Sequence, residues 1–293
     1  MTGWSLVVHG GAKTVAPDKA DAHRQGLLAA VEAGAAVLRQ GGSAIDAAEQ
    51  AVRALEEAVV FNAGYGSVLN ADGQVEMDAA LMEGAALRLG AVGAIQGVRH
   101  PISVARAMLD AVPVLLVGQG ARRFAAERGL ELCDAAEMIA PGVSSSEGGL
   151  DTVGCVARDA GGLIVAATST GGLAGKHPGR VGDSPLPGCG LYAEDSAGGV
   201  SVSGDGDRIA RILLSARVMR ALGQGDPWSA AQVGVDAMDR VGGEAGAIVL
   251  DRAGRIGCAH NSVHFAVGAA SSALAAPAAC LDRRELEEAI GRE

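Results

Sequence analysis

The spacing of apolar residues predicts two helices early in the chain. Apolar side chains three and four positions apart favour helices over about 27–38 and 43–55, and the run Ser43 to Asp46 has the pattern of a capping box. A short apolar run at 6–8 and further runs up to about position 92 predict strands. The first part of the chain therefore combines helices with short strands.

Hairpins dominate the pattern in the second half. Apolar runs on either side of turn-forming residues predict hairpins over 152–168 and 247–260, and another strand is expected at 199–203. A helix is expected to follow, and a second one begins at Asp226 with proline in its first turn. The apolar face of the first of these two helices is predicted to consist of Ile209, Ile212, Leu213, Ala216 and Met219.

A stretch without periodicity separates the two parts. Pro, Gly and Ser dominate residues 140–149, which is the composition of a linker. Hairpins imply antiparallel sheets, and helices must cover the outer faces of such sheets. The order of elements therefore predicts a layered α+β sandwich.

The composition narrows the classes of function. The chain of 293 residues has a net charge of −10 and no basic stripe, which argues against nucleic acid as a partner. Its five cysteines form no CxxC pair, which indicates reduced thiols rather than disulfides or a zinc site. The first residues carry neither a basic segment nor a long apolar run, so a cytoplasmic location and no membrane partner are expected.

Candidate chemistry gathers around Thr152, directly after the predicted linker. A threonine at the start of a strand is ordinary by itself, because β-branched residues favour strands. Cleavage of the chain before Thr152 would, however, leave a free α-amine beside its hydroxyl. Such an amine has a pKa of about 7.7 to 8.0, which suits a general base near neutral pH. One residue would then supply both nucleophile and base, in a chain whose six histidines show no Ser-His-Asp arrangement.

The cleavage itself requires no separate protease. The Thr152 hydroxyl would attack the carbonyl of Asp151 and form an ester that water hydrolyses. The Asp151 carboxylate is a candidate acceptor for the hydroxyl proton, although an aspartate at this position also suits an ordinary turn.

Five short motifs, spread in order over nearly the whole chain, resemble a known family. They are Val-His-Gly-Gly at 8–11, Phe-Asn-Ala-Gly at 61–64, Gly-Ser-Val-Leu-Asn at 66–70, Glu-Met-Asp-Ala at 76–79 and the run rich in hydroxyls and glycines at 152–190. With these motifs the chain resembles the threonine-dependent N-terminal nucleophile hydrolases of the isoaspartyl peptidase and plant-type L-asparaginase group, whose cousins include glycosylasparaginase and taspase.

The resemblance implies a fold and an assembly. The expected fold is an α+β four-layer αββα sandwich of antiparallel sheets. A single domain over 1–293 would consist of two chains from one precursor, an α chain of 1–151 and a β chain of 152–293. Two such protomers would form a homodimer.

The resemblance also implies a role for each hydroxyl of the site. Thr152 matches the nucleophile, and Thr170 matches the threonine that orients it. Ser203 stands where the family usually has a third threonine. The backbone N–H of Gly204 would complete the oxyanion hole beside Ser203.

Substrate binding is implied for four further residues. Arg180 matches the residue that grips the substrate α-carboxylate, a task that suits its planar guanidinium. Asp183 matches the acceptor of the substrate α-amine, and the backbone of Gly206 assists it. Asn62 is expected to pack near the nucleophile.

A structural sodium ion is the one cofactor that the resemblance implies. Relatives hold it through backbone carbonyls of a loop after the second predicted helix. The matching residues are Leu55, Glu56, Ala58, Phe61, Ala63 and Tyr65.

The sequence thus predicts an amidohydrolase that acts on β-aspartyl dipeptides, on L-asparagine or on both. Residues 150–152 and 176–179 look more like taspase, an endopeptidase, and residues 203–207 look closer to glycosylasparaginase. The abundant glycines leave a third alternative, a non-catalytic nucleotide-binding protein. Neither 64–66 nor 118–120, however, has the full glycine fingerprint of such a protein.

Overall fold

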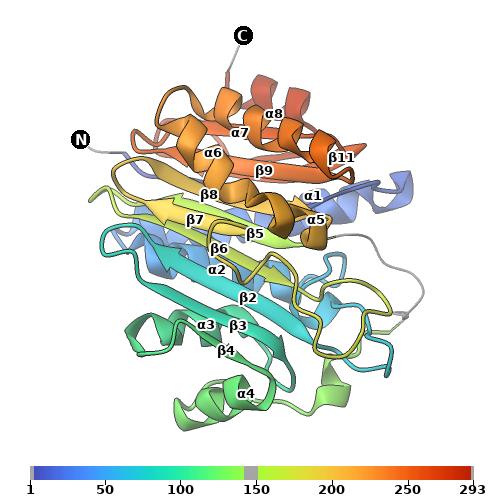
Figure 1. The fold of residues 1–293 in the computed structure, drawn as a ribbon. Helices are drawn as coiled ribbons and strands as arrows, with labels where there is room; N and C mark the ends of the chain where they lie inside the picture. Colours follow the sequence, from blue (N-terminus) through green and yellow to red (C-terminus); the bar gives the residue numbers. More distant parts are fainter. Residues whose placement is uncertain (1–2, 142–150, 292–293) are drawn as a thin grey trace.

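The computed structural model describes residues 3–141 and 151–291 as a mixed α/β protein with two β-sheets (Figure 1). The predicted linker at 140–149 lies almost entirely outside these residues. The larger sheet contains, in spatial order, β12 (Ala278–Cys280), β11 (His264–Ser271), β1 (Ser5–Lys13), β5 (Val153–Arg158), β6 (Ile164–Thr170), β2 (Met77–Glu83), β3 (Leu89–Ile95) and β4 (Leu115–Val117). The smaller sheet contains β10 (Ile256–His260), β9 (Ala245–Asp251), β8 (Gly198–Gly204) and β7 (Leu191–Glu194).

The described residues form eight α-helices. They are α1 (Ala20–Arg39), α2 (Ala44–Glu57), α3 (Pro101–Ala107), α4 (Gly118–Glu127), α5 (Gly206–Ile212), α6 (Leu214–Leu222), α7 (Pro227–Asp236) and α8 (Arg283–Ala289). Helices α1 to α3 pack against the larger sheet, and α6 and α7 pack against the smaller one. None of the helices in the described ranges has the length and apolar character to cross a membrane.

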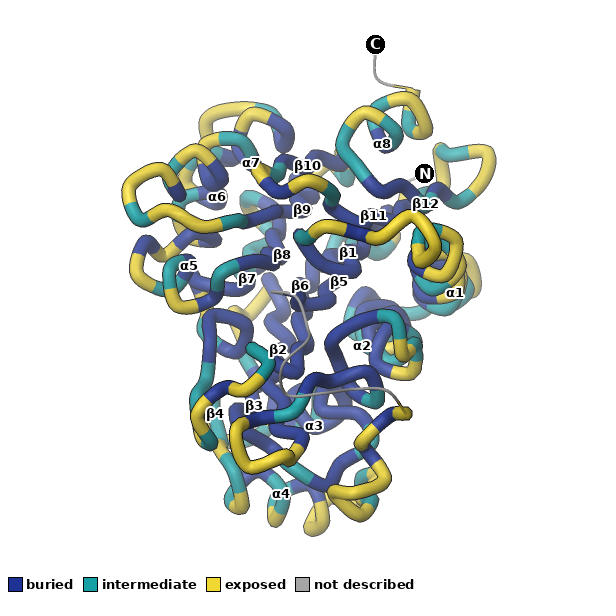
Figure 2. The backbone as a smooth tube through the Cα atoms, turned by 90° about the vertical axis from the view of Figure 1, so that its right-hand side faces the viewer, coloured by how far each residue is buried: buried dark blue, intermediate teal, exposed yellow. Residues whose placement is uncertain are grey.

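Three apolar clusters hold these elements together. One joins α1 to α3 to the larger sheet, a second lies between the two sheets, and a third joins the smaller sheet to α6 and α7. Figure 2 shows most of the strands as buried and the outer sides of the helices as exposed, while β4 at the edge of the larger sheet is only partly buried. The start of α2 follows the prediction, since the Ser43 hydroxyl accepts a hydrogen bond of 3.1 Å from the Asp46 N–H.

Two predictions are wrong. The larger sheet is not purely antiparallel, because β3 and β4 pair in parallel. A parallel pair needs a crossover connection, and α3 provides it. The predicted helix over 209–219 is interrupted at Leu213, whose backbone is left-handed with φ of 54°. Because the helix restarts there, Leu213 and Ala216 are exposed while Leu214 and Val218 are buried.

The alternation of side chains along three strands creates the site. Val153, Cys155 and Ala157 of β5 face the helices, so the even-numbered positions of that strand face the smaller sheet. On β6 the same alternation sends Thr168 and Thr170 toward the smaller sheet. On β8, Val200 and Val202 belong to the outer cluster, so Ser201 and Ser203 face inward. Hydroxyl groups from both sheets therefore meet between them.

Candidate active site

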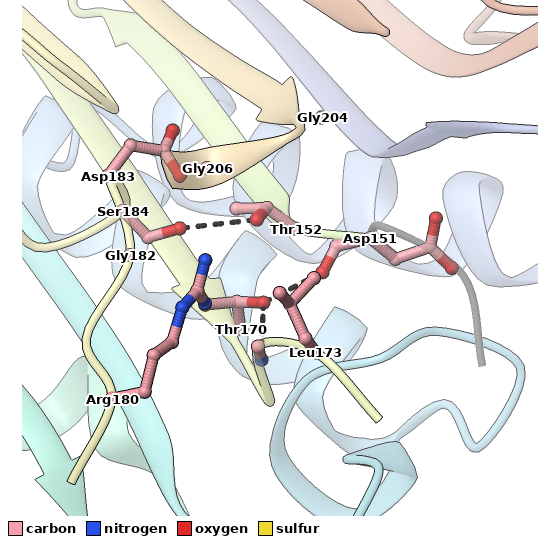
Figure 3. A pocket seen from close by; sticks show the side chains of 11 residues that line it. Asp151, Thr152, Thr170, Leu173, Arg180, Gly182, Asp183, Ser184, Gly204 and Gly206 are labelled. Carbon is pink, nitrogen blue, oxygen red and sulfur yellow. Dashed lines mark hydrogen bonds between the residues drawn. The ribbon is translucent and has the colours of Figure 1, made fainter. Parts of the chain in front are cut away.

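Thr152 lies directly before β5, a central strand that pairs with β1 and β6. Its backbone N–H donates a hydrogen bond of 3.1 Å to the Ser203 hydroxyl oxygen, which also accepts the Ala12 N–H at 3.1 Å. Two donated bonds occupy both lone pairs of Ser203, so its own proton is free to be donated. The Thr152 hydroxyl lies 3.2 Å from that of Ser184 (Figure 3).

The carbonyl of Asp151 belongs to the bond that the sequence predicts to break. Its oxygen accepts a hydrogen bond of 2.7 Å from the Thr170 hydroxyl and one of 3.3 Å from the Asn62 side-chain amide. Thr170 accepts the Gly172 N–H at 3.0 Å, which fixes the direction of its own proton. Two donors on one carbonyl oxygen favour the build-up of negative charge there.

The Asp151 carboxylate does not contact the Thr152 hydroxyl. It forms a partly buried ion pair with Lys13 instead, and Figure 3 shows it pointing away from the Thr152 side chain. Burial raises the pKa of Asp151, and the charge of Lys13 opposes that rise. The contacts of Asp151 therefore do not support the hypothesis that it takes the proton from Thr152.

Arg180 and Asp183 line the same small pocket as Thr152 (Figure 3). Asp183 is 3% exposed, and its Oδ2 has no hydrogen-bond partner among the described residues. Burial raises the pKa of Asp183 to about 7 despite the nearby charge of Arg180. Gly206 makes room for this carboxylate, because a Cβ there would lie 2.5 Å from Asp183 Oδ1. A buried acceptor without a partner suits the ammonium group of a ligand.

Arg180 carries its own counterion in the structure. Its Nη2 lies 3.1 Å from Oδ1 of Asp207, and its Nε donates to the same oxygen at 3.3 Å. The Arg180 side chain is 16% exposed and that of Asp207 is 61% exposed. The guanidinium is therefore partly desolvated, while its partner remains open to solvent.

A histidine and a serine contact each other behind the pocket, but they do not form a catalytic triad. Nε2 of His9 lies 2.8 Å from the Ser201 hydroxyl, and the Ser201 hydroxyl donates to the Ala167 carbonyl at 3.2 Å. Burial lowers the pKa of His9 to about 3, so its ring is neutral. Neither residue lines the pocket.

The loop predicted to hold sodium turns tightly after α2. The backbone N–H groups of this loop donate to the carbonyls of Leu55, Ala58, Phe61 and Ala63. Gly64 and Gly66 are required by close approaches, because a Cβ there would lie 2.4 Å from the Glu56 carbonyl oxygen and 2.1 Å from that of Phe61. Each carbonyl keeps a second lone pair, and carbonyl oxygens are ligands that hard cations accept. A cation held by the backbone of this loop stays a prediction from the sequence.

The structure brings the predicted catalytic and binding residues together at one end of β5, β6 and β8. Three residues of this region were not predicted from the sequence: Lys13, Ser184 and Asp207. Ser184 lies within the Gly-Asp-Ser-Pro run at 182–185, so its position beside Asp183 was an available signal. Lys13 and Asp207 are single charged residues whose partners are chosen only by the fold.

Comparison with known proteins defines the class of this fold and site. The model of a family described as asparaginase matches residues 2–146 and 140–276. The chain belongs to this asparaginase family.

Several curated relatives cover most of their own length and most of this chain. The isoaspartyl peptidase/L-asparaginase of Bos taurus is 40% identical over 268 residues, which are 85% of this chain and 87% of the relative. The protein of the same name from Homo sapiens has the same identity and coverage. The one from Xenopus laevis is 39% identical over 266 residues, with 85% and 86% covered.

Proposed function

We propose that this protein is a self-cleaving amidohydrolase that hydrolyses β-aspartyl dipeptides, L-asparagine or both, with Thr152 as its nucleophile. The observation that carries the proposal is a single pocket that combines Thr152 with Arg180 and Asp183. The opposite charges of Arg180 and Asp183 match the carboxylate and ammonium of an amino acid. The names of the curated relatives support the same reaction.

The first step divides the chain into residues 1–151 and 152–293. The Thr152 hydroxyl attacks the Asp151 carbonyl, whose oxygen Thr170 and Asn62 hold. The C–N bond breaks, the hydroxyl proton ends on the Thr152 nitrogen, and water hydrolyses the resulting ester. Thr152 then carries a free amine that titrates near neutral pH and acts as general base.

The second step turns over the substrate. Arg180 binds the α-carboxylate and Asp183 with the Gly206 backbone binds the α-amine, which places the side-chain carbonyl at the Thr152 hydroxyl. The Ser203 hydroxyl and the Gly204 N–H stabilise the oxyanion, and each such donor contributes about 3 kcal/mol. The leaving amine takes a proton from the Thr152 ammonium, and water releases aspartate.

The finer features of the fold and assembly belong to the same proposal. Helices on the outer faces of two packed sheets support a four-layer αββα sandwich of one domain. The carbonyl-rich loop supports a structural sodium ion held by the backbone of Leu55, Glu56, Ala58, Phe61, Ala63 and Tyr65. The homodimer and the cytoplasmic location stay predictions from the sequence.

The intact mass of the purified protein tests the proposal. Wild type held at neutral pH is expected to give two fragments, the second beginning at Thr152, while Thr152→Ala stays whole. The cut protein is expected to release aspartate from β-aspartyl dipeptides or L-asparagine. A wild type that stays whole and hydrolyses neither substrate would contradict the proposal.

The choice of substrate separates the related activities. Asp183 has no evident use in an endopeptidase, because the residue it would contact inside a polypeptide has no free α-amine. Cleavage of proteins after aspartate would therefore favour the taspase-like alternative, and release of sugar-linked amine would favour the glycosylasparaginase alternative. Saturable nucleotide binding by an uncut chain would indicate the non-catalytic alternative.

A further inference from the structure

The last three residues of β1, at 11–13, lie around the bond between Asp151 and Thr152 that is predicted to break. Gly11 has φ of 111°, and a Cβ there would lie 2.6 Å from Asp151 Oδ1. The Ala12 N–H donates to the Ser203 hydroxyl, which also binds the Thr152 N–H. The Lys13 ammonium binds Asp151 Oδ2. The pairing of β1 with β11 shifts register between His9 and Ala12, as strands often do next to active sites.

The ion pair lies where it affects the charge of the cleavage step. The Asp151 side chain is 2% exposed and that of Lys13 is 16% exposed, so water screens the pair poorly. Only Cα and Cβ separate the Asp151 carboxyl group from the scissile carbonyl carbon. Attack by Thr152 places negative charge on that carbonyl oxygen, and an uncompensated carboxylate so close would oppose it.

We propose that Lys13 is a positioning residue of self-cleavage: it neutralises the Asp151 carboxylate and holds it away from Thr152, so that the scissile carbonyl accepts charge. The inference rests on the proposed function. In this step the bond from Thr152 Oγ1 to the Asp151 carbon forms, the C–N bond breaks, and the hydroxyl proton passes to the Thr152 nitrogen. Lys13 forms no covalent bond in this step and acts only through its ion pair with Asp151.

A set of charge variants tests this role. Lys13→Met removes the charge but keeps much of the length of the side chain, and it is expected to slow self-cleavage at least about tenfold. Lys13→Arg keeps the charge and is expected to cleave within about threefold of wild type. In the double variant Lys13→Met/Asp151→Asn neither charge is present, so most of the lost rate is expected to return. Intact mass against time gives each rate.

Stability is measured separately, on the same substitutions combined with Thr152→Ala. Thermal unfolding of these uncut proteins shows whether Lys13→Met folds. If Lys13→Met does not fold, the comparison is made between Asp151→Asn and the double variant Lys13→Met/Asp151→Asn. The self-cleavage rates of these two proteins are expected to agree within about threefold. A purely structural ion pair would lower thermal stability and leave the rate of the folded precursor unchanged.

Three results would overturn the inference. They are cleavage of Lys13→Met at the wild-type rate, a double variant as slow as Lys13→Met, and a large effect of Lys13→Met when residue 151 is already Asn. A wild type that does not cleave would overturn the proposed function first. If wild type cleaves itself and Lys13→Met cleaves at the same rate, only the role of Lys13 would be overturned.

Discussion

Asp207 forms an ion pair with Arg180, in which Oδ1 of Asp207 lies 3.1 Å from Nη2 of Arg180. Arg180 lines the pocket that contains Thr152. A substrate α-carboxylate that binds Arg180 must therefore displace Asp207 or share the guanidinium with it. Because the Asp207 carboxylate is mostly exposed, releasing it to water costs little.

Asp207→Asn is expected to lower KM for L-asparagine or a β-aspartyl dipeptide. An exposed ion pair contributes about 0 to 1 kcal/mol, which corresponds to a decrease in KM of up to about fivefold, with kcat little changed. Steady-state kinetics of the cleaved enzyme measures this. Asp239→Asn, at an exposed position in the short helix Ala237–Arg240, is the control with the same change in net charge. An increase in KM for Asp207→Asn alone would instead mean that Asp207 orients Arg180 for binding.

Thr170→Val is expected to slow self-cleavage by about 10² to 10³. The substitution keeps the shape of the side chain but removes the hydroxyl that donates to the Asp151 carbonyl at 2.7 Å. The fraction of cut chain against time measures the effect. Thr168→Val is the matched control, since Thr168 lies on the same face of β6 and donates to the Ser184 carbonyl. Equal slowing by both substitutions would contradict a specific role for Thr170.

Activity is expected to depend on the ionisation of Asp183. Burial raises its pKa to about 7, and only the carboxylate, which predominates above that pH, attracts the substrate ammonium. We therefore expect kcat/KM to fall as pH decreases below about 7, by up to tenfold per unit. Asp183→Asn is expected to have low activity and to lack this component of the pH profile. A profile that keeps the same component in Asp183→Asn would assign the titration to another group, such as the Thr152 amine.

The stability of the folded chain is expected to fall in acid partly because of His9. Burial lowers the pKa of His9 to about 3, whereas in the unfolded chain it is about 6.5. Between these values the unfolded chain binds a proton that the folded chain does not. The free energy of unfolding thus falls with decreasing pH by up to about 1.4 kcal/mol per unit. Urea unfolding of Thr152→Ala, with and without His9→Gln, measures this, and equal slopes in the two proteins would be inconsistent with it.

Local patterns carried enough information to predict which hydroxyl residues of one strand share a face. The predicted strand ends at Thr168, whereas β6 continues to Thr170. Continuing the alternation of that strand puts Thr170 on the face of Thr168 and Ser169 on the other. The structure agrees, since Ser169 donates to Glu56 of α2 at 2.7 Å on the helical side of the sheet. The alternation of a strand depends only on the backbone, which explains why the sequence predicts it.

Continuity of a helix was harder to predict. Ile209 and Met219 have the spacing of one helical face, yet Leu213 adopts a left-handed backbone and divides the segment. Close spacing of apolar residues is compatible both with one helix and with two that pack at an angle. Packing against β8 and α7 selects the second arrangement.

The sequence by itself predicted the nucleophile, the hydroxyls that accompany it and the opposite charges for an amino-acid substrate, because these residues lie in short motifs that resemble a known family. Only the tertiary structure decided which charges pair. Lys13 and Asp151 are 138 residues apart, and Arg180 binds Asp207 rather than Asp183. Long charged side chains have no periodic pattern, and their partners depend on which surfaces the folded chain brings within a few ångströms of one another.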